Sequence, residues 1–273
     1  MSEAGGAAGA PERIAKRIAR SGLCSRRDAE RLIEERRVAV DGEVLSSPAV
    51  TVTSANLVTV DGEPLAAPEA PRLFRYHKPP GVMTAARDPE GRPTFYDRLP
   101  EDLPRLMPIG RLDFSSEGLL LLTNDGGLKR RLELPATGWL RRYRVRVHGQ
   151  IDEAALASLA SGITVEGFRY GPIEARLDRV QGSNAWLGIA LREGKNREVR
   201  RIMEQLGWRV TRLIRVSFGP FQLGRLPSGA VDEVSGKVLR EQLGALLAGD
   251  GDRSRYRNLK EDRARIPAPR SRH

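Results

Sequence analysis

The stretch GRLDFSSEGLLLLTNDG, residues 110–126, places one carboxylate where it could take part in catalysis. Asp113 follows an arginine and precedes the apolar run 119–122, with Gly110 and Gly118 on either side. A carboxylate held in a tight loop beside a rigid strand is well placed to act as a nucleophile. No histidine or cysteine lies near it in the sequence, so Asp113 would have to act alone. The residues also allow a simpler interpretation, an ordinary surface ion pair of little energetic weight.

The composition indicates a polyanion as the partner. Lysine and arginine number 46 against 35 aspartates and glutamates, which gives a net charge of +11 over 273 residues. Such an excess is typical of proteins that bind nucleic acid. No stretch approaches the roughly 20 apolar residues that a membrane-spanning helix needs, and residues 1–12 lack the features of a secretory signal. We therefore expect a soluble, cytoplasmic protein that binds nucleic acid and no membrane.

The sequence offers no site for a metal or a nucleotide cofactor. Cys24 is the only cysteine, and His77, His148 and His273 stand at no metal-ligand spacing. The stretch GIALREGKN resembles a phosphate loop but has five residues between its glycines and ends in asparagine. No glycine-rich cofactor loop follows a predicted strand, which argues against an RNA methyltransferase, and no helix-turn-helix or zinc-finger pattern indicates DNA binding. We therefore expect no cofactor and no metal.

Residues 12–65 form one predicted unit. ERIAKRIARSGL predicts a helix with Ile14, Ile18 and Leu23 on its apolar side, and Ser25 caps a second helix. VAVDGEVL and VTVDGEPL each predict a hairpin with a type I′ turn at the Asp-Gly pair. So many basic residues on two adjacent helices indicate phosphate binding, although any single one could lie on a solvated helix face. The basic residues in question include Arg13, Lys16, Arg17, Arg26, Arg27 and Arg31.

The rest of the chain divides into a linker, a larger unit and tails. Residues 66–72, AAPEAPR, are expected to be the linker, and residues 73–246 mix strands and helices in an α+β order. Residues 1–11 are rich in small side chains, and we expect them to be a disordered tail. Residues 247–273 are polar and basic, and we expect them to be disordered in the absence of RNA.

Two elements of the larger unit carry basic side chains in a regular pattern. RYRVRVHG predicts a strand with Tyr143 and two valines on one face and arginines on the other. NREVRRIMEQLGW predicts an amphipathic helix that contains Arg200. The arginines on the exposed face of the strand are Arg142, Arg144 and Arg146.

The segment around Asp113 is similar to the active-site signature of the RsuA/RluB group of pseudouridine synthases. Three further blocks resemble that group in the same order: YHKPPGVMTAARDPEGRPTFYDRLP, RRYRVRVHG and LREGKNREVRRIMEQLGWRVTRLIRVSFGPFQLGRLPSG. Residues 12–65 resemble the S4 domain, a small RNA-binding module. The form EGKNREVRR most resembles RluB-like enzymes, which modify a uridine of large-subunit ribosomal RNA. Ser116 stands where the family more often has threonine, a change that keeps the hydroxyl.

The resemblance implies an architecture and a reaction. The fold would be α+β, with a small S4-like α/β domain before a catalytic domain whose mixed, largely antiparallel sheet is flanked by helices. The enzyme would flip a uridine of 23S ribosomal RNA out of its stack and isomerise it to pseudouridine without a cofactor. Its substrate would be free RNA or a pre-ribosomal particle, and a monomer is the default expectation.

The resemblance also assigns roles to individual residues. Asp113 would be the obligatory nucleophile or proton acceptor, Arg200 would pair with it, and Tyr143 would stack on the flipped base. From the residues alone, the favoured interpretation of Arg200 is a pair with Glu204 on the helix surface, and Tyr143 could equally be a core residue. Arg111 could fill the space that the base leaves or hold a phosphate. The residues of the larger unit expected to contact RNA are Arg111, Arg142, Arg144, Arg146, Lys195 and Arg197.

Two other functions stay open at this point. A non-catalytic S4-type protein that assists ribosome assembly would have the same charge and helices without needing Asp113. A pseudouridine synthase acting on small-subunit ribosomal RNA would share the motifs and differ in its target.

Overall fold

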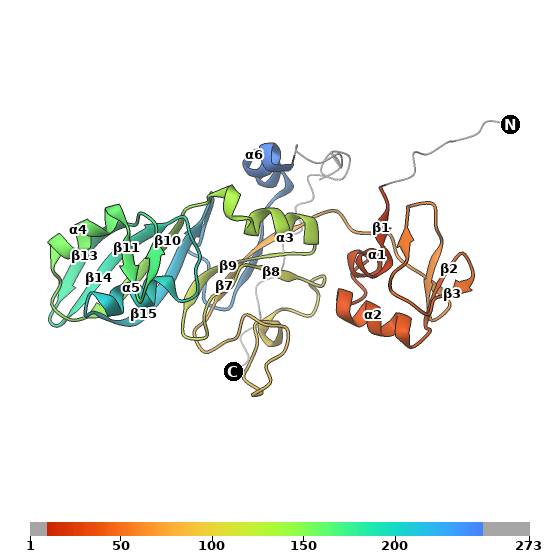
Figure 1. Cartoon of the computed structure of the whole chain (residues 1–273), viewed down its shortest axis with the longest axis horizontal. Helices are drawn as coiled ribbons and strands as arrows, with labels where there is room; N and C mark the ends of the chain where they lie inside the picture. Colours follow the sequence, from red (N-terminus) through yellow and green to blue (C-terminus); the bar gives the residue numbers. More distant parts are fainter. Residues whose placement is uncertain (1–9, 248–273) are drawn as a thin grey trace.

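The computed structural model of the chain describes residues 10–247, so the two predicted tails lie almost entirely outside the described residues. The first elements form a module of two helices and short strands (Figure 1). They are β1 (Glu12–Arg13), α1 (Ile14–Arg20), α2 (Arg26–Glu34), β2 (Val38–Val40), β3 (Glu43–Val44), β4 (Thr51–Val52), β5 (Val58–Val60) and β6 (Glu63–Pro64).

The two predicted hairpins of this N-terminal module are confirmed. Asp41 and Gly42 have φ angles of 51° and 89°, and Asp61 and Gly62 have 53° and 82°. Two successive residues with positive φ are what a type I′ turn requires, because its twist matches that of the flanking strands. β2 and β5 pair with each other, so the hairpins join into one sheet in the order β3-β2-β5-β6.

Both helices of the module pack their apolar sides into a shared core with this sheet. Ile14 and Ile18 of α1 and Ile33 of α2 are fully buried there. The Ser25 side chain accepts a hydrogen bond from the backbone of Asp28, which confirms the predicted helix start. Leu23 corrects the prediction: α1 ends at Arg20, and Leu23 lies in the connection beyond it with 55% of its surface exposed.

The larger unit is built on a long mixed sheet. In the described part of the chain its strand order is β13-β14-β10-β15-β9-β7-β17, with β8 and β16 on the side. Every neighbouring pair is antiparallel except β9 and β15, which confirms the predicted α+β class with a largely antiparallel sheet. The elements are β7 (Leu73–Lys78), η1 (Tyr96–Arg98), β8 (Met107–Ile109), β9 (Glu117–Thr123), α3 (Gly126–Glu133), η2 (Pro135–Thr137), β10 (Arg141–His148), α4 (Glu153–Ser158), η3 (Leu159–Ser161), β11 (Ile163–Val165), β12 (Phe168–Tyr170), β13 (Glu174–Gln181), β14 (Asn184–Leu191), α5 (Glu198–Gln205), β15 (Arg209–Phe218), β16 (Phe221–Gln222), β17 (Val231–Glu233) and α6 (Gly236–Leu247).

Helices cover one face of each half of this sheet. α4 and α5 pack on β10, β13, β14 and β15, whereas α3 and α6 pack on β7 and β9. On β15, Leu213 packs into the core beneath α4 and α5, whereas the adjacent Ile214 packs against the core of α3 and α6, so the two pairs of helices lie on opposite faces of the sheet. The opposite face of β7 and β9 is covered by residues of the connection between β7 and β8, among them Phe95 and Leu106. None of the helices in the described residues has the length and apolar character needed to cross a membrane.

The two halves of the sheet meet where β9 lies parallel to β15. Gly118 pairs with Arg215 at this junction and has a φ of +106°. A Cβ atom at Gly118 would overlap the backbone of Arg215, so only glycine allows the strands to approach this closely. The junction immediately follows the loop that carries Asp113, and its geometry therefore sets where that loop lies.

We expect the substitution Gly118→Ala to lower the free energy of unfolding by roughly 3 kcal/mol, because it adds both an unfavourable φ and an overlap with a neighbouring strand. Gly224→Ala is the matched control. Gly224 has a φ of +59° with no heavy atom within 4 Å of an added Cβ, so the loss there should be about 1 kcal/mol. Chemical denaturation followed by circular dichroism measures both, and equal losses would contradict the proposed close approach.

Candidate active site

A buried lysine holds the loop that carries Asp113. Lys78, the last residue of β7, has no exposed surface. Its ammonium group donates hydrogen bonds to the carbonyl oxygens of Pro79 at 3.0 Å, Asp113 at 3.1 Å and Ser116 at 2.8 Å. Burial lowers the pKa of Lys78 to about 8, and the carboxylates of Asp113 and Glu117 act in the opposite direction. The side chain of Lys78 therefore holds the backbone of this loop in place.

Further contacts anchor the start of the same loop. The backbone N–H of Gly110 donates to Glu133 Oε1 on α3 at 2.7 Å. The hydroxyl of Thr84 donates to the carbonyl of Leu112 at 2.8 Å. The backbone is therefore held on both sides of Asp113.

Two guanidinium groups flank the Asp113 carboxylate. Arg200 Nε lies 3.9 Å and Arg197 Nη1 lies 4.0 Å from Asp113 Oδ2. Arg200 is buried and also donates from Nη2 to the carbonyl of Ser115 at 3.3 Å. Burial lowers the pKa of Arg200, the charge of Arg197 lowers it further, and Asp113 acts in the opposite direction. Arg200 thus faces Asp113; the charge of Glu204 also acts to raise the pKa of Arg200, but no salt bridge between these two side chains is found among the described residues.

Asp113 and Tyr143 line one open cavity of about 900 Å3. The Asp113 side chain is 31% exposed, which leaves its carboxylate accessible from this cavity. Tyr143 lies on β10 and packs against the core beneath α5. The basic residues that line the cavity are Arg111, Lys129, Arg141, Lys195, Arg197 and Arg215, together with Arg27 of the N-terminal module.

The other sequence-predicted residues lie away from this cavity. Arg142 and Arg144 are exposed on β10, and they alternate with Tyr143, which places them on the opposite face of the strand. Arg13, Lys16, Arg17, Arg26 and Arg31 belong to the N-terminal module. Among them, Lys16 forms an ion pair with Glu12, and Arg31 forms one with Asp28.

Sequence reasoning missed Lys78 and a second buried cation, Arg215. Arg215 is 3% exposed, lies opposite Tyr143 in the sheet, and donates from Nε to the carbonyl of Leu119 at 2.7 Å. Burial lowers the pKa of Arg215, and Tyr143 acts in the opposite direction. Its place on the same side of β15 as Leu213 could have indicated burial. Lys78 is the last residue of its strand, and a lysine at the end of a strand is ordinarily exposed, so nothing in the sequence indicated its burial.

Glu198 is a third buried ionisable group beside the cavity. It is the first residue of α5, is 4% exposed, and accepts a hydrogen bond from the backbone N–H of Lys195 at 2.9 Å. Burial raises the pKa of Glu198 to about 7, the hydrogen bond from Lys195 lowers it, and the neighbouring Glu193 raises it. Glu198 therefore titrates near neutral pH. Within residues 10–247, no group of three or more histidine, cysteine, aspartate or glutamate side chains could hold a metal ion.

Comparisons with known proteins point to one family. The family model described as RNA pseudouridylate synthase matches residues 72–205, and the S4 domain model matches residues 12–58. A Rickettsia felis protein named as an uncharacterised RNA pseudouridine synthase is 44% identical over 230 residues, which cover 84% of this chain and all of that protein. The ribosomal large subunit pseudouridine synthase B of Yersinia pestis is 39% identical, covering 94% of this chain and 83% of that protein. A solved structure of a pseudouridylate synthase is 27% identical, with a TM-score of 0.59, over 85% of this chain and 99% of that one.

We expect Glu198→Gln to stabilise the protein above neutral pH. The folded-state pKa of Glu198 is raised, so the energetic penalty of ionising it in the fold is absent below about pH 4.5 and is fully present above about pH 7. Glutamine removes that penalty, which should increase the free energy of unfolding by roughly 1–3 kcal/mol at pH 8 and by much less at pH 5. Urea denaturation at both values measures the difference. The exposed Glu204→Gln on the same helix is the control, and a Glu198→Gln protein less stable than wild type at pH 8 would disprove the effect.

Proposed function

This chain belongs to the RNA pseudouridine synthases, and we propose that it isomerises a uridine of large-subunit ribosomal RNA with Asp113 as its essential carboxylate. The observation that carries this proposal is the position of Asp113. Its carboxylate lies between Arg200 and Arg197, in the wall of a cavity that also contains Tyr143. The cavity of about 900 Å3 has room for an extruded nucleotide.

The reaction breaks the C1′–N1 bond of the uridine and joins C1′ to C5 of the same base, and the proton on C5 moves to N1. Nothing is oxidised or reduced. The target nucleotide must leave its stack first, because its sugar carbon and its base edge are otherwise covered. Asp113 either attacks the nucleotide or accepts a proton, and both steps require its ionised form. The guanidinium groups of Arg200 and Arg197 lie 3.9 Å and 4.0 Å from this carboxylate.

The remaining cavity residues would orient the RNA. Tyr143 would stack on the extruded uracil, since every base presents a π-face to an aromatic ring. Arg111 is exposed beside Asp113 and either fills the gap that the base leaves or holds a phosphate. Lys195 already pairs with Glu193 at 2.8 Å, so its contribution to phosphate binding should be smaller.

The S4 domain would supply RNA affinity next to the catalytic cavity. Arg26 and Arg27 stand exposed at the start of α2, and Arg27 lines the cavity itself. Contacts from such residues to phosphates strengthen binding without reading sequence. A ribosomal RNA substrate, free or in an assembling particle, would place the enzyme in the cytoplasm.

Mapping pseudouridines in ribosomal RNA tests the function directly. A strain without the gene should lack one or more pseudouridines in large-subunit RNA, and the wild-type gene should restore them. The Asp113→Asn gene should not, because the near-isosteric amide lacks the charge. The purified variant should keep wild-type RNA affinity within about threefold and lose pseudouridine formation by on the order of 1,000-fold or more.

Each contrary result identifies a different alternative. Restoration by Asp113→Asn would reject the catalytic aspartate. An unchanged pattern in the deletion strain would favour a non-catalytic assembly protein. If pseudouridines were missing in small-subunit RNA alone, the substrate would be small-subunit ribosomal RNA.

For the S4 domain, we expect Arg26→Ala/Arg27→Ala to weaken RNA binding and to lower the slope of log affinity against log salt by about 2, because two phosphate contacts are lost. The matched control removes two exposed basic residues elsewhere, Arg225→Ala/Lys237→Ala. Filter binding at several salt concentrations measures the slope. Identical slopes for the two variants would reject a specific role for α2.

A further inference from the structure

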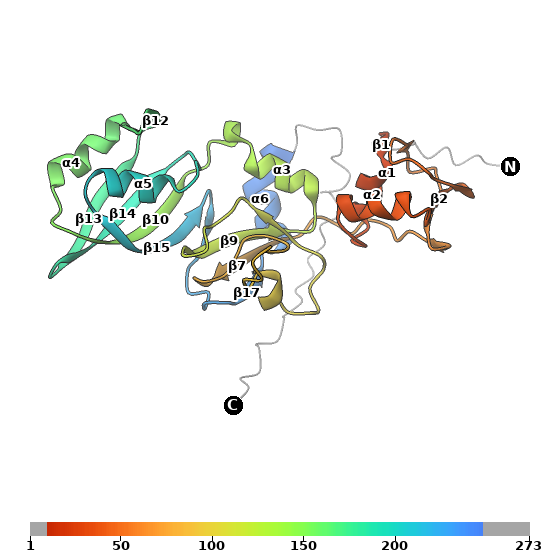
Figure 2. The same cartoon turned by 60° about the horizontal axis from the view of Figure 1, so that its bottom comes forward.

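The strand that carries Tyr143 has a second functional face. Tyr143 faces the core beneath α5 and the catalytic cavity, whereas Arg142 and Arg144 project from the other side of β10. In Figure 2, α4 and α5 lie on one side of β10, β13 and β14. The exposed side chains on the opposite side show that this face is open to solvent. These arginines therefore lie on the other face of the sheet from the catalytic cavity.

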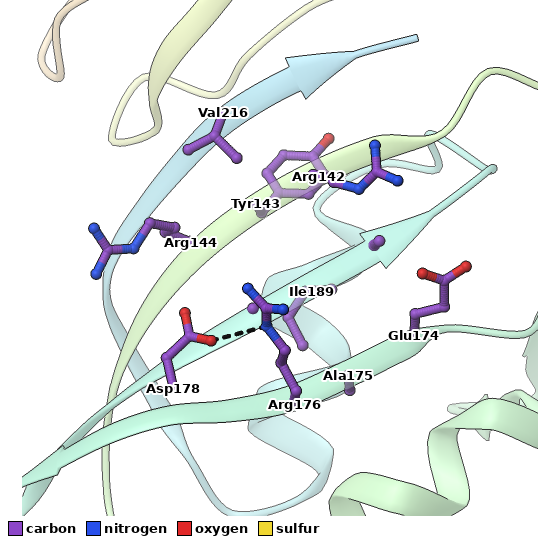
Figure 3. Close-up of a pocket in the computed structure, with 11 residues that line it drawn as sticks. Arg142, Tyr143, Arg144, Glu174, Ala175, Arg176, Asp178, Ile189 and Val216 are labelled. Carbon is purple, nitrogen blue, oxygen red and sulfur yellow. Dashed lines mark hydrogen bonds and ion pairs between the residues drawn. The ribbon is translucent and has the colours of Figure 1, made fainter. Parts of the chain in front are cut away.

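This open face contains a hollow of about 410 Å3 (Figure 3). Its floor is the central strand β14, where the small residues Gly188 and Ala190 face it. One wall is formed by Arg142 and Arg144 of β10, which pairs with β14 on that side. The hollow exists because the floor positions lack large side chains, and its flat floor suits a planar ring.

Two carboxylates and one arginine form the opposite wall of the hollow. Glu174, Arg176 and Asp178 come from β13, on the other side of β14. Arg176 Nε donates to Asp178 Oδ1 at 2.9 Å, the contact drawn in Figure 3. Glu174 is exposed at the rim. Such carboxylates accept hydrogen bonds from the N–H groups of nucleobases.

Both arginines of this wall are exposed, and the guanidinium of Arg144 is held beside an aromatic ring. The guanidinium of Arg144 lies 4.8 Å from the ring centre of Trp186, and Trp186 occupies the same face of β14 as Gly188. Stacking on an aromatic ring restrains the guanidinium while its N–H donors stay free to bind a phosphate. Arg146 is the next residue of this face along β10, and it lies opposite Trp186.

We propose that this hollow is a second RNA-binding site, which holds one unpaired nucleotide of the substrate away from the reaction centre. The proposal rests on the function proposed above. The base lies on the floor made by Gly188 and Ala190 and donates its N–H groups to the carboxylates of β13. Its flanking phosphates bind Arg142 and Arg144. The site contributes affinity and the choice of RNA, and it takes no part in bond making or breaking.

The first experiment reverses the charge of the arginine wall in the full-length protein. Arg142→Glu/Arg144→Glu should raise the Kd for a large-subunit ribosomal RNA transcript by about 10- to 100-fold at physiological salt, because two phosphate contacts become repulsive. The single-turnover rate of pseudouridine formation at saturating enzyme should stay within about threefold of wild type. Arg225→Glu/Lys237→Glu makes the same change in net charge outside the hollow and should raise the Kd far less. Equal losses in the two variants would overturn the proposal.

A second variant tests the hollow without changing any charge. An added Cβ at Gly188 would meet the flexible Arg176 side chain, 2.9 Å from its Nε, so Gly188→Val should fold and fill the floor. We expect its Kd for the transcript to rise by about fivefold or more, with a thermal midpoint close to that of wild type. An unchanged Kd would show that no base enters the hollow and would overturn the site. Should Gly188→Val fail to fold, the crosslinks described next decide instead.

Photo-crosslinking of a 4-thiouridine-substituted transcript supplies the independent readout. Crosslinked peptides should include residues 142–146 or 174–178, and their absence would overturn the site. Both binding and crosslinking are measured without pseudouridine formation. If the wild-type protein forms no pseudouridine, the proposed function fails while these readouts still judge the RNA site. If pseudouridine forms and the arginine wall has no effect on binding, only the second site fails.

Discussion

The ammonium group of Lys78 lies among the backbone carbonyls of the loop that carries Asp113. A lone buried ammonium is strongly disfavoured, so the loop has to keep its carbonyls directed at Lys78 for the fold to tolerate the charge. The same contacts that satisfy Lys78 therefore fix the backbone of Asp113. A catalytic carboxylate needs this kind of support, because a displacement of about 1 Å can slow a reaction by on the order of 100-fold.

The groups around Asp113 come from both halves of the sheet, and the parallel contact between β9 and β15 brings them together. Lys78 belongs to the half that contains β7 and β9, whereas Arg200 and Tyr143 belong to the half that contains α5 and β10. Gly118 permits the close approach of the two halves directly after the loop that carries Asp113. The proposed reaction centre therefore forms at the junction of the two halves, and neither half contains it alone.

Much of this arrangement could be predicted from the sequence, and the exceptions have a common cause. The alternation of apolar and basic residues in RYRVRVHG predicted which side chains share a face of β10. The helical spacing of apolar residues in NREVRRIMEQLGW predicted the buried face of α5, and the two Asp-Gly pairs predicted two hairpins. These features could be predicted because each depends on residues close together in the sequence. The pairing of Arg200 with Asp113 required the family resemblance, since the residues lie far apart in sequence. Lys78, Arg215 and Glu198 were missed because a charged side chain is ordinarily exposed, and only the fold shows the partners that allow their burial.

The most direct measurement of the central claim keeps the charge of residue 113 and moves it. Asp113→Glu extends the side chain by one methylene while Lys78 holds the backbone in place. Tritium release from a ribosomal RNA transcript labelled at C5 of uridine reports the single-turnover rate. If the fixed position of the carboxylate governs the reaction, the rate should fall by about 100-fold or more in a protein of unchanged stability. A rate within tenfold of wild type would show that the position is not decisive and would contradict the mechanism.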